Sequence, residues 1–174
     1  RGRGALARDA CTLAIGPSAL AWTGQALTIT LDEIAVPWPA RIRGTVTLHP
    51  AALPVHAMTL DTEGAHRWRP IAPCARIDVA LAQPALRWSG PAYWDGNDGD
   101  APLEDAFAHW HWSRATTREG TAVLYDVQRR DGTRAAFALQ CSSDGATRAF
   151  AMPQDVVLPR SRWGVARATH ADAP

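Results

Sequence analysis

The residues with the clearest chemical potential lie between positions 88 and 113. This segment, WSGPAYWDGNDGDAPLEDAFAHWHWS, places a glycine-rich acidic loop among tryptophans. Aromatic side chains usually pack in apolar cores, whereas charged residues usually face water. A carboxyl group held against aromatic rings is poorly hydrated and can stay protonated near neutral pH. The segment therefore predicts a carboxylic acid that can donate a proton.

The carboxylates of this loop have three competing interpretations. They are Asp95, Asp98, Asp100, Glu104 and Asp105. The first is a calcium loop, but the run DGNDGD lacks the full ligand pattern with its terminal glutamate. The second is a solvated turn, which suits the Asn-Asp-Gly sequence. The third is catalysis by Asp95, which directly follows Tyr93 and Trp94 and, in an extended chain, shares a face with Tyr93.

Two further pairs of residues alternate in the same way. His66 and Trp68 are two positions apart and would share one face of a strand, although core packing of Trp68 and a surface histidine remain the alternative. His109 and His111 alternate with tryptophans, but no third ligand follows at a spacing typical of a metal site. We therefore predict that the chain binds no metal.

Composition limits the function classes. The chain has 174 residues, 47% hydrophobic and 20% charged, which excludes wholesale disorder and allows one domain or one domain with part of another. Its basic residues are all arginine, are scattered, and leave a net charge of +1, so we expect no nucleic-acid partner. Cys11, Cys74 and Cys141 form no metal or disulfide pattern. No apolar run approaches a membrane span, and the absence of an initial methionine leads us to expect a fragment.

The hydropathy pattern is mainly that of strands. Alternating runs at 27–34, 40–48, 75–81, 121–128 and 135–140 are separated by turn sequences such as Asp131-Gly132. Only 9–15 and 103–108 resemble short helices. The proline-bearing stretches 68–73 and 83–91 are expected to be edges or connections, with a domain junction near 69–73. The pattern predicts an antiparallel sandwich or barrel.

The run RWSGPAYWDGNDGDAPLEDAFAHWHWSRA resembles the carotenoid 1,2-hydratases, also called hydroxyneurosporene synthases. The flanking sequences HRWRPIAPCARI and TAVLYDVQRRDG, the opening RGRGALARDACTLAIGPSAL and the closing LPRSRWGVARAT are also similar to that family. The resemblance implies a mainly β fold of antiparallel lipocalin-like β-barrels. Residues 1–70 would end the first barrel domain and residues 71–174 would form the second.

The resemblance also implies a reaction, the addition of water to the terminal C1–C2 double bond of acyclic carotenoids such as neurosporene and lycopene. It implies no cofactor and places the catalytic residues at His66, Trp68, Tyr93 and Asp95. Asp95 would protonate the alkene to a tertiary cation, which aromatic faces stabilise and water captures. His66 would orient water and accept its proton, or hydrogen-bond Asp95. Trp88, Trp94, Trp110 and Trp112 are expected to bind substrate.

Two alternatives to this enzyme remain open from sequence. A lipocalin-like module would bind an apolar isoprenoid without chemistry, and a related cyclase would fold a polyene by the shape of its cavity. The expected partners are the acyclic carotenoid and water. We expect a cytoplasmic protein that contacts the inner membrane surface, because the substrate is too apolar to dissolve freely.

Overall fold

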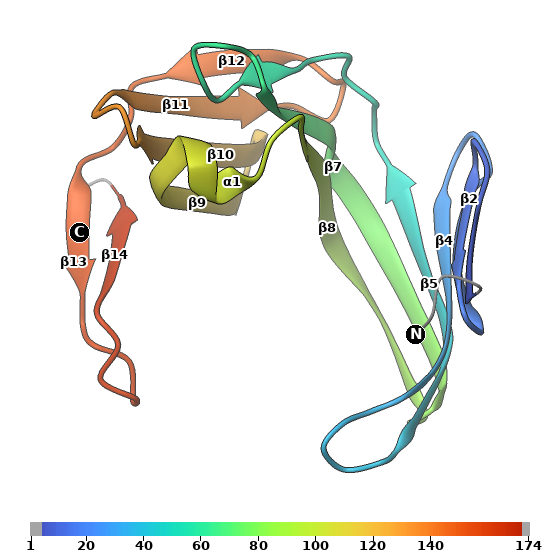
Figure 1. Cartoon of the computed structure of the whole chain (residues 1–174). Coiled ribbons are helices and arrows are strands. Elements are labelled where there is room, and N and C mark those ends of the chain that lie inside the picture. Colours follow the sequence, from blue (N-terminus) through green and yellow to red (C-terminus); the bar gives the residue numbers. More distant parts are fainter. Residues whose placement is uncertain (1–4, 172–174) are drawn as a thin grey trace. The chain divides into compact units, whose positions relative to one another are not determined.

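The computed structural model describes residues 5–171, and nearly all of its regular structure is β-strand (Figure 1). The strands are β1 Leu6–Arg8, β2 Thr12–Ile15, β3 Ser18–Trp22, β4 Leu27–Ile34, β5 Arg41–Pro50, β6 Met58–Thr59, β7 His66–Gln83, β8 Leu86–Gly99, β9 Phe107–Thr117, β10 Gly120–Arg129, β11 Arg134–Cys141, β12 Thr147–Phe150, β13 Asp155–Leu158 and β14 Arg167–His170. The helix α1, Leu103–Ala106, lies between β8 and β9.

The chain divides into two compact units that interleave along the sequence. Unit 1 comprises Arg1–Leu53 and Cys74–Trp94, and unit 2 comprises Pro54–Pro73 and Asp95–Pro174. The long strands β7 and β8 therefore each contribute one part to unit 1 and one part to unit 2. The predicted division into lipocalin-like domains at 70/71 stays a prediction.

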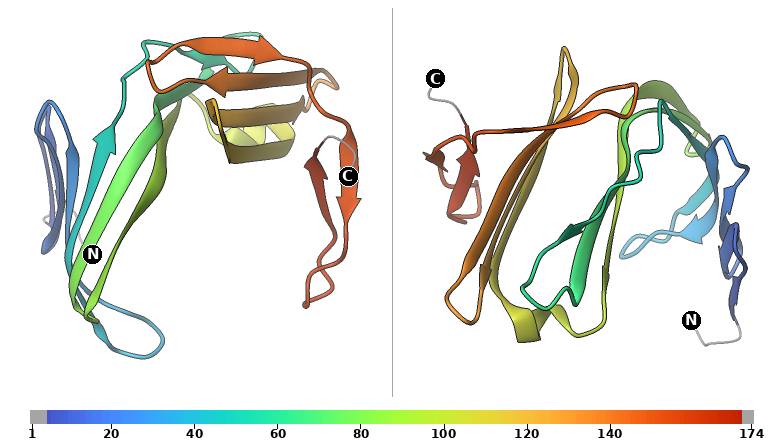
Figure 2. Two further views of the ribbon diagram at one scale, coloured as in Figure 1. Left: turned by 180° about the vertical axis from the view of Figure 1, so that it is seen from behind. Right: turned by 90° about the horizontal axis from the view of Figure 1, so that it is seen from above.

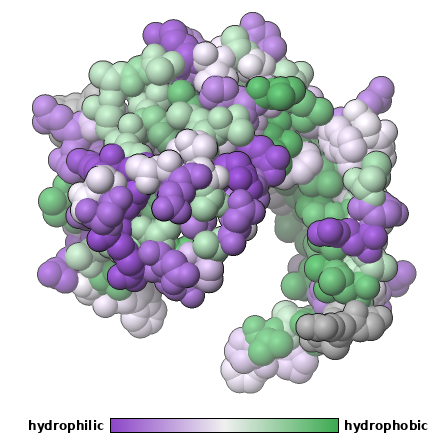
Figure 3. Space-filling model, turned by 45° about the horizontal axis from the view of Figure 1, so that its top comes forward, coloured by the Kyte–Doolittle hydropathy of each residue, from purple (hydrophilic) through white to green (hydrophobic). Residues whose placement is uncertain are grey.

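Unit 1 is an antiparallel sheet in the order β1-β2-β3-β4-β5-β7, with β8 paired to β7. Alternation puts Leu20, Ile29, Val46 and Val79 in one cross-strand row, because each is the register partner of the next. Apolar side chains also reach the surface of this unit, among them Val36 in the β4–β5 loop, and Figure 3 shows hydrophobic residues at the surface of the molecule.

Unit 2 contains a four-stranded antiparallel sheet in the order β12-β11-β10-β9 and a hairpin of β13 and β14 (Figure 2). Along β10 every second residue is buried, including Val123, Tyr125 and Val127. Register places Trp110 opposite Val127 and Trp112 opposite Tyr125. The tryptophans of the HWHW sequence therefore share the buried face of β10, and the histidines share the other face.

Most of the predicted elements are confirmed. The strand predicted at 27–34 has the bounds of β4, and β10 and β11 extend the predicted runs by one residue at each end. Strand β5 begins one residue after the predicted run 40–48 and ends two residues beyond it. The Asp131-Gly132 hairpin joins β10 to β11, with Gly132 at a φ of 86° that favours glycine. Helix α1 begins where one was predicted but ends after four residues.

The helix predicted at 9–15 is wrong. Asp9 Oδ1 accepts hydrogen bonds from the backbone N–H groups of Cys11 and Thr12, at 2.8 and 2.7 Å, and this turn feeds strand β2. An aspartate whose side chain accepts hydrogen bonds from the following backbone N–H groups competes with helix formation.

Among residues 5–171 the structure has no helix with the length and apolarity needed to cross a bilayer.

The prediction that the proline-bearing stretches 68–73 and 83–91 are edges or connections is confirmed only for the second stretch. Pro84 follows the end of β7 and Pro91 lies in β8, the edge of the unit 1 sheet, as predicted. Residues 68–73, however, lie inside β7, where Pro70 and Pro73 are fully buried. These prolines fall between the stretch of β7 that pairs with β6 at 67–68 and the stretch that pairs with β5 from Ala75. Both prolines therefore lie in the interval between the β6 and β5 pairings of β7.

The sheets do not close among the described residues, since each strand order ends in edge strands. The mainly β, antiparallel part of the predicted fold class is confirmed. The lipocalin-like barrel stays a prediction.

The backbone of β7 comes so close to Gly44 of β5 that a side chain at this position would disturb the packing of these two strands. A Cβ at this position would lie 2.4 Å from the Ala80 carbonyl oxygen and 2.5 Å from the Leu81 Cα, beside an irregularity in the β5–β7 register. We expect Gly44→Ala to lower the free energy of unfolding by about 3 kcal/mol, because backbone atoms must move. Gly90→Ala in β8, whose nearest neighbour would be 3.5 Å away, is the matched control in urea denaturation and should cost less than about 1 kcal/mol. Equal losses in the two variants would contradict the steric argument.

Candidate active site

An aromatic cluster forms the core of unit 2. Trp68 of β7 is 0% exposed and packs against Tyr125 and Phe137, with ring centroids 5.2 and 5.6 Å away. Tyr125 and Phe137 are register partners on β10 and β11 and stack at 5.1 Å. Trp110 adds a further ring 5.3 Å from Tyr125. Such contacts fix the orientation of the Trp68 indole as well as burying it.

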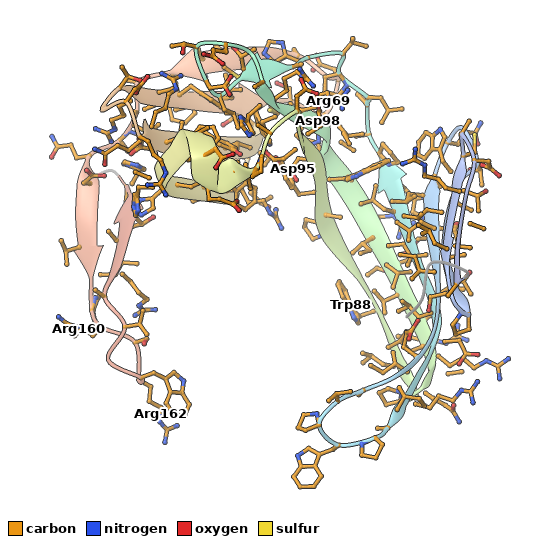
Figure 4. All side chains as sticks on the ribbon, in the orientation of Figure 1. Arg69, Trp88, Asp95, Asp98, Arg160 and Arg162 are labelled. Atoms are coloured by element: carbon orange, nitrogen blue, oxygen red, sulfur yellow. The ribbon has the colours of Figure 1, made fainter. Side chains whose placement is uncertain are left out.

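The buried indole brings a carboxyl group to the cluster. The Trp68 Nε1–H group donates a hydrogen bond to Asp95 Oδ2 at 2.7 Å. A buried indole N–H requires an acceptor, and the Asp95 carboxyl supplies it from the neighbouring strand β8. Asp95 is half-buried, and Figure 4 shows it near the end of β8 that enters unit 2.

A second donor from the cluster reaches the same strand. The Tyr125 hydroxyl donates to Asn97 Oδ1 at 2.8 Å, and Asn97 lies two residues beyond Asp95 on β8. Burial raises the pKa of the Tyr125 phenol, and the nearby charge of Asp95 raises it further, against the opposing effect of a hydrogen bond with Trp110. Tyr125 is therefore neutral at physiological pH and serves as a donor and an aromatic surface.

His66 is buried between two acceptors. Its Nδ1 lies 2.6 Å from Asp61 Oδ2, and its Nε2 lies 2.9 Å from the Ala101 carbonyl oxygen. A neutral imidazole has only one N–H, so both contacts are hydrogen bonds only when the ring is protonated. The hydrogen bond with Asp61 raises the pKa of His66 against the opposing effect of burial. Burial would raise the pKa of Asp61, but hydrogen bonds from His66 and Ala65 outweigh it and lower that pKa.

His66 lines two surface pockets within unit 2. The larger has a volume of about 270 Å³ and includes Asp61, Glu63, Asp105 and Arg129 in its lining. The smaller has a volume of about 130 Å³ and includes Leu60, Asn97, Leu103 and Trp110. The smaller pocket thus adjoins both Asn97, the partner of Tyr125, and Trp110 of the aromatic cluster.

Two of the other loop carboxylates, Asp98 and Asp100, form ion pairs with arginines of β7. Asp98 accepts from Arg67 at 2.8 Å and from Arg69 at 2.6 Å, and Asp100 lies 3.3 Å from Arg67 (Figure 4). The hydrogen bond from Arg67 lowers the pKa of Asp98, against a smaller effect of burial. Among residues 5–171, no group of three or more histidine, cysteine, aspartate or glutamate residues is arranged to hold a metal ion.

Three of the four predicted catalytic residues, His66, Trp68 and Asp95, lie in unit 2, and a hydrogen bond joins Trp68 directly to Asp95. Tyr93 lies on the part of β8 that belongs to unit 1. Trp88 and Trp94, predicted to bind substrate, also lie in unit 1, where Trp94 packs 5.9 Å from Trp22. The hydrogen bonds of His66 go to Asp61 and Ala101, so the expectation that it bonds Asp95 is wrong.

The two β9 tryptophans differ in environment. Trp110 is half-buried and makes an edge contact with Phe107 at 5.4 Å, whereas Trp112 is exposed. His109 and His111 face each other, with their Nε2 atoms 2.7 Å apart.

Sequence analysis missed Asp61, Asn97 and Tyr125. Tyr125 lay on the buried side of the predicted strand 121–128, so its burial could have been predicted from alternation. Its contact with Asn97 spans 28 residues, and no local pattern indicates it. Asp61 lies five residues before His66, and only the fold shows that its carboxyl group returns to the His66 ring.

The Asp61–His66 pair predicts a pH dependence of stability. The raised His66 pKa contributes stability that is complete below about pH 6.5 and is lost as pH rises through the folded-state pKa. The lowered Asp61 pKa contributes stability that is complete above about pH 3.9 and is lost as pH falls through the folded-state pKa. We expect Asp61→Asn to lower the free energy of unfolding by about 3 kcal/mol at pH 6, and by less at pH 9.

Chemical denaturation across this pH range measures the effect. Asp131→Asn is a control, because its pKa is also lowered but by the exposed hydroxyl and N–H of Thr133 rather than by a buried imidazole. A wild-type stability that rises from pH 6 to pH 9 would contradict the assignment of a buried imidazolium.

Comparison with known proteins identifies the family. The family model for the carotenoid hydratase CrtC matches residues 1–174. The acyclic carotenoid 1,2-hydratase of Thiocapsa roseopersicina is 48% identical over 99% of this chain and 43% of its own length. The protein of the same name from Rubrivivax gelatinosus is 46% identical over 96% of the chain and 41% of its own length.

The chain thus spans about two fifths of the length of these two relatives. A quinolone epoxide rearrangement protein of Emericella nidulans is 31% identical over 51% of the chain. No solved structure matches the chain. Because the family model covers every residue, the chain belongs to the carotenoid hydratase CrtC family.

Proposed function

We propose that this chain carries the acid of a carotenoid 1,2-hydratase, which adds water to the terminal C1–C2 double bond of an acyclic carotenoid. The observation that carries the proposal is the hydrogen bond from the buried Trp68 indole to Asp95. It holds a carboxyl group at the edge of an aromatic cluster, as protonation of an apolar alkene requires. The family supports the reaction type, since its curated members are named acyclic carotenoid 1,2-hydratases.

The proposed reaction needs only one carboxyl group and water. The Asp95 carboxylic acid gives its proton to C2 of the alkene, which leaves a carboxylate and a tertiary cation at C1. The oxygen of a water molecule then bonds to C1. The resulting protonated alcohol returns one proton to Asp95, so the acid is regenerated and the net change is addition of H2O. The proposal requires no metal and no organic cofactor.

Aromatic faces are suited to the cationic step. A cation is attracted to the negative face of an aromatic ring, and such rings do not trap it covalently. Trp68 and Tyr125 are fully buried and act through packing, whereas the half-buried Trp110 beside them lines the smaller pocket. Tyr93, two residues before Asp95 on β8, is retained as a further predicted ring.

His66 is assigned a positioning role instead of the role of a base. Both ring nitrogens are hydrogen-bonded, which ties Asp61, β7 and Ala101 together. When both ring nitrogens donate to these acceptors, the ring has no free lone pair with which to accept a proton. The carboxylate of Asp95 is therefore the acceptor in the final step.

The remaining parts of the proposal concern setting and architecture. The substrate would be an acyclic carotenoid such as neurosporene or lycopene, taken up at the inner surface of the cytoplasmic membrane. The two units would belong to lipocalin-like barrels in the protein's full architecture. Nucleic acid is not a proposed partner.

Replacement of Asp95 is the direct test. We expect Asp95→Asn to reduce formation of the 1-hydroxy product at least 100-fold in lycopene-accumulating cells, because an amide has no transferable proton of suitable acidity. Asp98→Asn, on the same strand but paired with two arginines, is the matched control and should keep more than half of the activity. Chromatography of extracted carotenoids measures both. Wild-type product levels in Asp95→Asn would refute the acid assignment, and binding of lycopene without any product by the wild type would favour a binding module.

The Tyr125–Asn97 hydrogen bond predicts a smaller, coupled effect. Tyr125→Phe keeps the ring and removes the donor to Asn97, so we expect kcat to fall about tenfold with little change in KM. Asn97→Ala should give a similar loss, and the double variant should lose no more than either single variant, because both remove the same interaction. Independent, multiplicative losses would show that the two side chains act separately.

A further inference from the structure

The turn of the β13–β14 hairpin exposes a tryptophan. Trp163 is 87% exposed and Val165 is 59% exposed, although large apolar side chains usually contribute to a core. In Figures 1 and 2 the turn end of this hairpin points away from the four-stranded sheet of the same unit. The tryptophan is therefore presented outward at the end of an extended element.

The turn that carries Trp163 is rigidly built. The Ser161 hydroxyl oxygen accepts hydrogen bonds from the N–H groups of Trp163 and Val165, at 3.3 and 3.1 Å. The Arg160 guanidinium donates to the Gly164 carbonyl at 2.7 Å, and the Arg167 guanidinium donates twice to the Pro159 carbonyl. Gly164 supplies the required positive φ of 74°. An exposed apolar side chain on an ordered turn costs little further entropy when it binds a surface.

The charge around the turn has one sign. Residues 156–169 contain Arg160, Arg162 and Arg167 and no aspartate or glutamate. Within the part of the chain that the structure describes, none of these arginines forms an ion pair. Figure 4 shows Arg160 and Arg162 projecting from the turn end of the hairpin.

We propose that this hairpin is a docking element for an anionic lipid surface, with Trp163 and Val165 inserted among the headgroups, Arg160 and Arg162 bound to lipid phosphates, and Arg167 adding positive charge. Tryptophan favours the boundary between headgroups and acyl chains. Arginine binds phosphate through paired N–H groups, and basic residues are attracted to anionic leaflets. This inference rests on the proposed function, which supplies the apolar substrate. It adds to that function the surface of the chain that meets the membrane.

A second exposed tryptophan serves as an internal comparison. Trp38, in the β4–β5 loop of unit 1, is 83% exposed. Its flanking charges are balanced, because Asp32 and Glu33 precede the loop and Arg41 and Arg43 follow it. Arg41 also forms a bidentate hydrogen bond with Asp32. Trp38 therefore matches Trp163 in exposure but lacks the excess of positive charge.

Sedimentation with lipid vesicles tests the proposal. We expect wild-type protein to bind phosphatidylglycerol vesicles more tightly than phosphatidylcholine vesicles, and to bind less tightly as salt rises. Trp163→Ser should weaken binding to phosphatidylglycerol about tenfold, and Arg160→Gln with Arg162→Gln about 25-fold. Trp38→Ser should change it less than twofold. Three results would overturn the proposal. The first is unchanged vesicle binding by both hairpin variants, and the second is an equal loss of vesicle binding in Trp38→Ser. The third is a wild-type protein that binds an oligonucleotide and not the vesicles, with oligonucleotide binding lost in the hairpin variants.

Activity assays separate this proposal from the proposed reaction. Trp163→Ser should hydrate detergent-dispersed lycopene at the wild-type rate but lose activity on lycopene embedded in phosphatidylglycerol vesicles. Equal activity of this variant and the wild type on embedded lycopene would contradict the docking role. If the wild type hydrates neither form, the proposed reaction fails, whereas the vesicle-binding result still decides the docking role.

Discussion

The hydrogen bond from Trp68 to Asp95 is the interaction on which the site depends. A fully buried indole N–H must find an acceptor, and here the acceptor is a half-buried carboxyl group on the adjacent strand, 2.7 Å away. The indole cannot rotate away, because Tyr125 and Phe137 pack against it. The orientation of the carboxyl group is therefore set by the packing of unit 2.

A second hydrogen bond of the same kind reaches the next alternate residue of β8. Trp68 donates to Asp95 and Tyr125 donates to Asn97, so two neighbouring rings of the core each hold one of two alternate residues on the strand. The rings themselves are in contact, with centroids 5.2 Å apart. A change in either ring would be transmitted to the strand through a hydrogen bond as well as through packing. The packing of this core and the placement of Asp95 therefore depend on the same contacts.

Sequence reasoning succeeded where the determinants are local. Alternation along β4 and β10 and the Asp131-Gly132 turn predicted strands and a hairpin, because the period of two and the left-handed turn position are properties of short segments. It failed at Pro70, since only the fold shows that this proline lies between the partners β6 and β5 of one strand. Alternation singled out Trp68 and Asp95 as members of two pairs and the resemblance to a family grouped these pairs, but neither showed the hydrogen bond between them across 27 residues. The Tyr125–Asn97 bond had no such guide.

The partners of the carboxylates distinguish their roles. Asp98 is held by two arginines and Asp61 by His66, and in both cases the partner lowers the pKa of the carboxyl group. Asp95 receives a hydrogen bond from an indole, which is a neutral donor. The proposed role of Asp95 as an acid therefore goes with a different kind of partner from the charged side chains that hold Asp98 and Asp61.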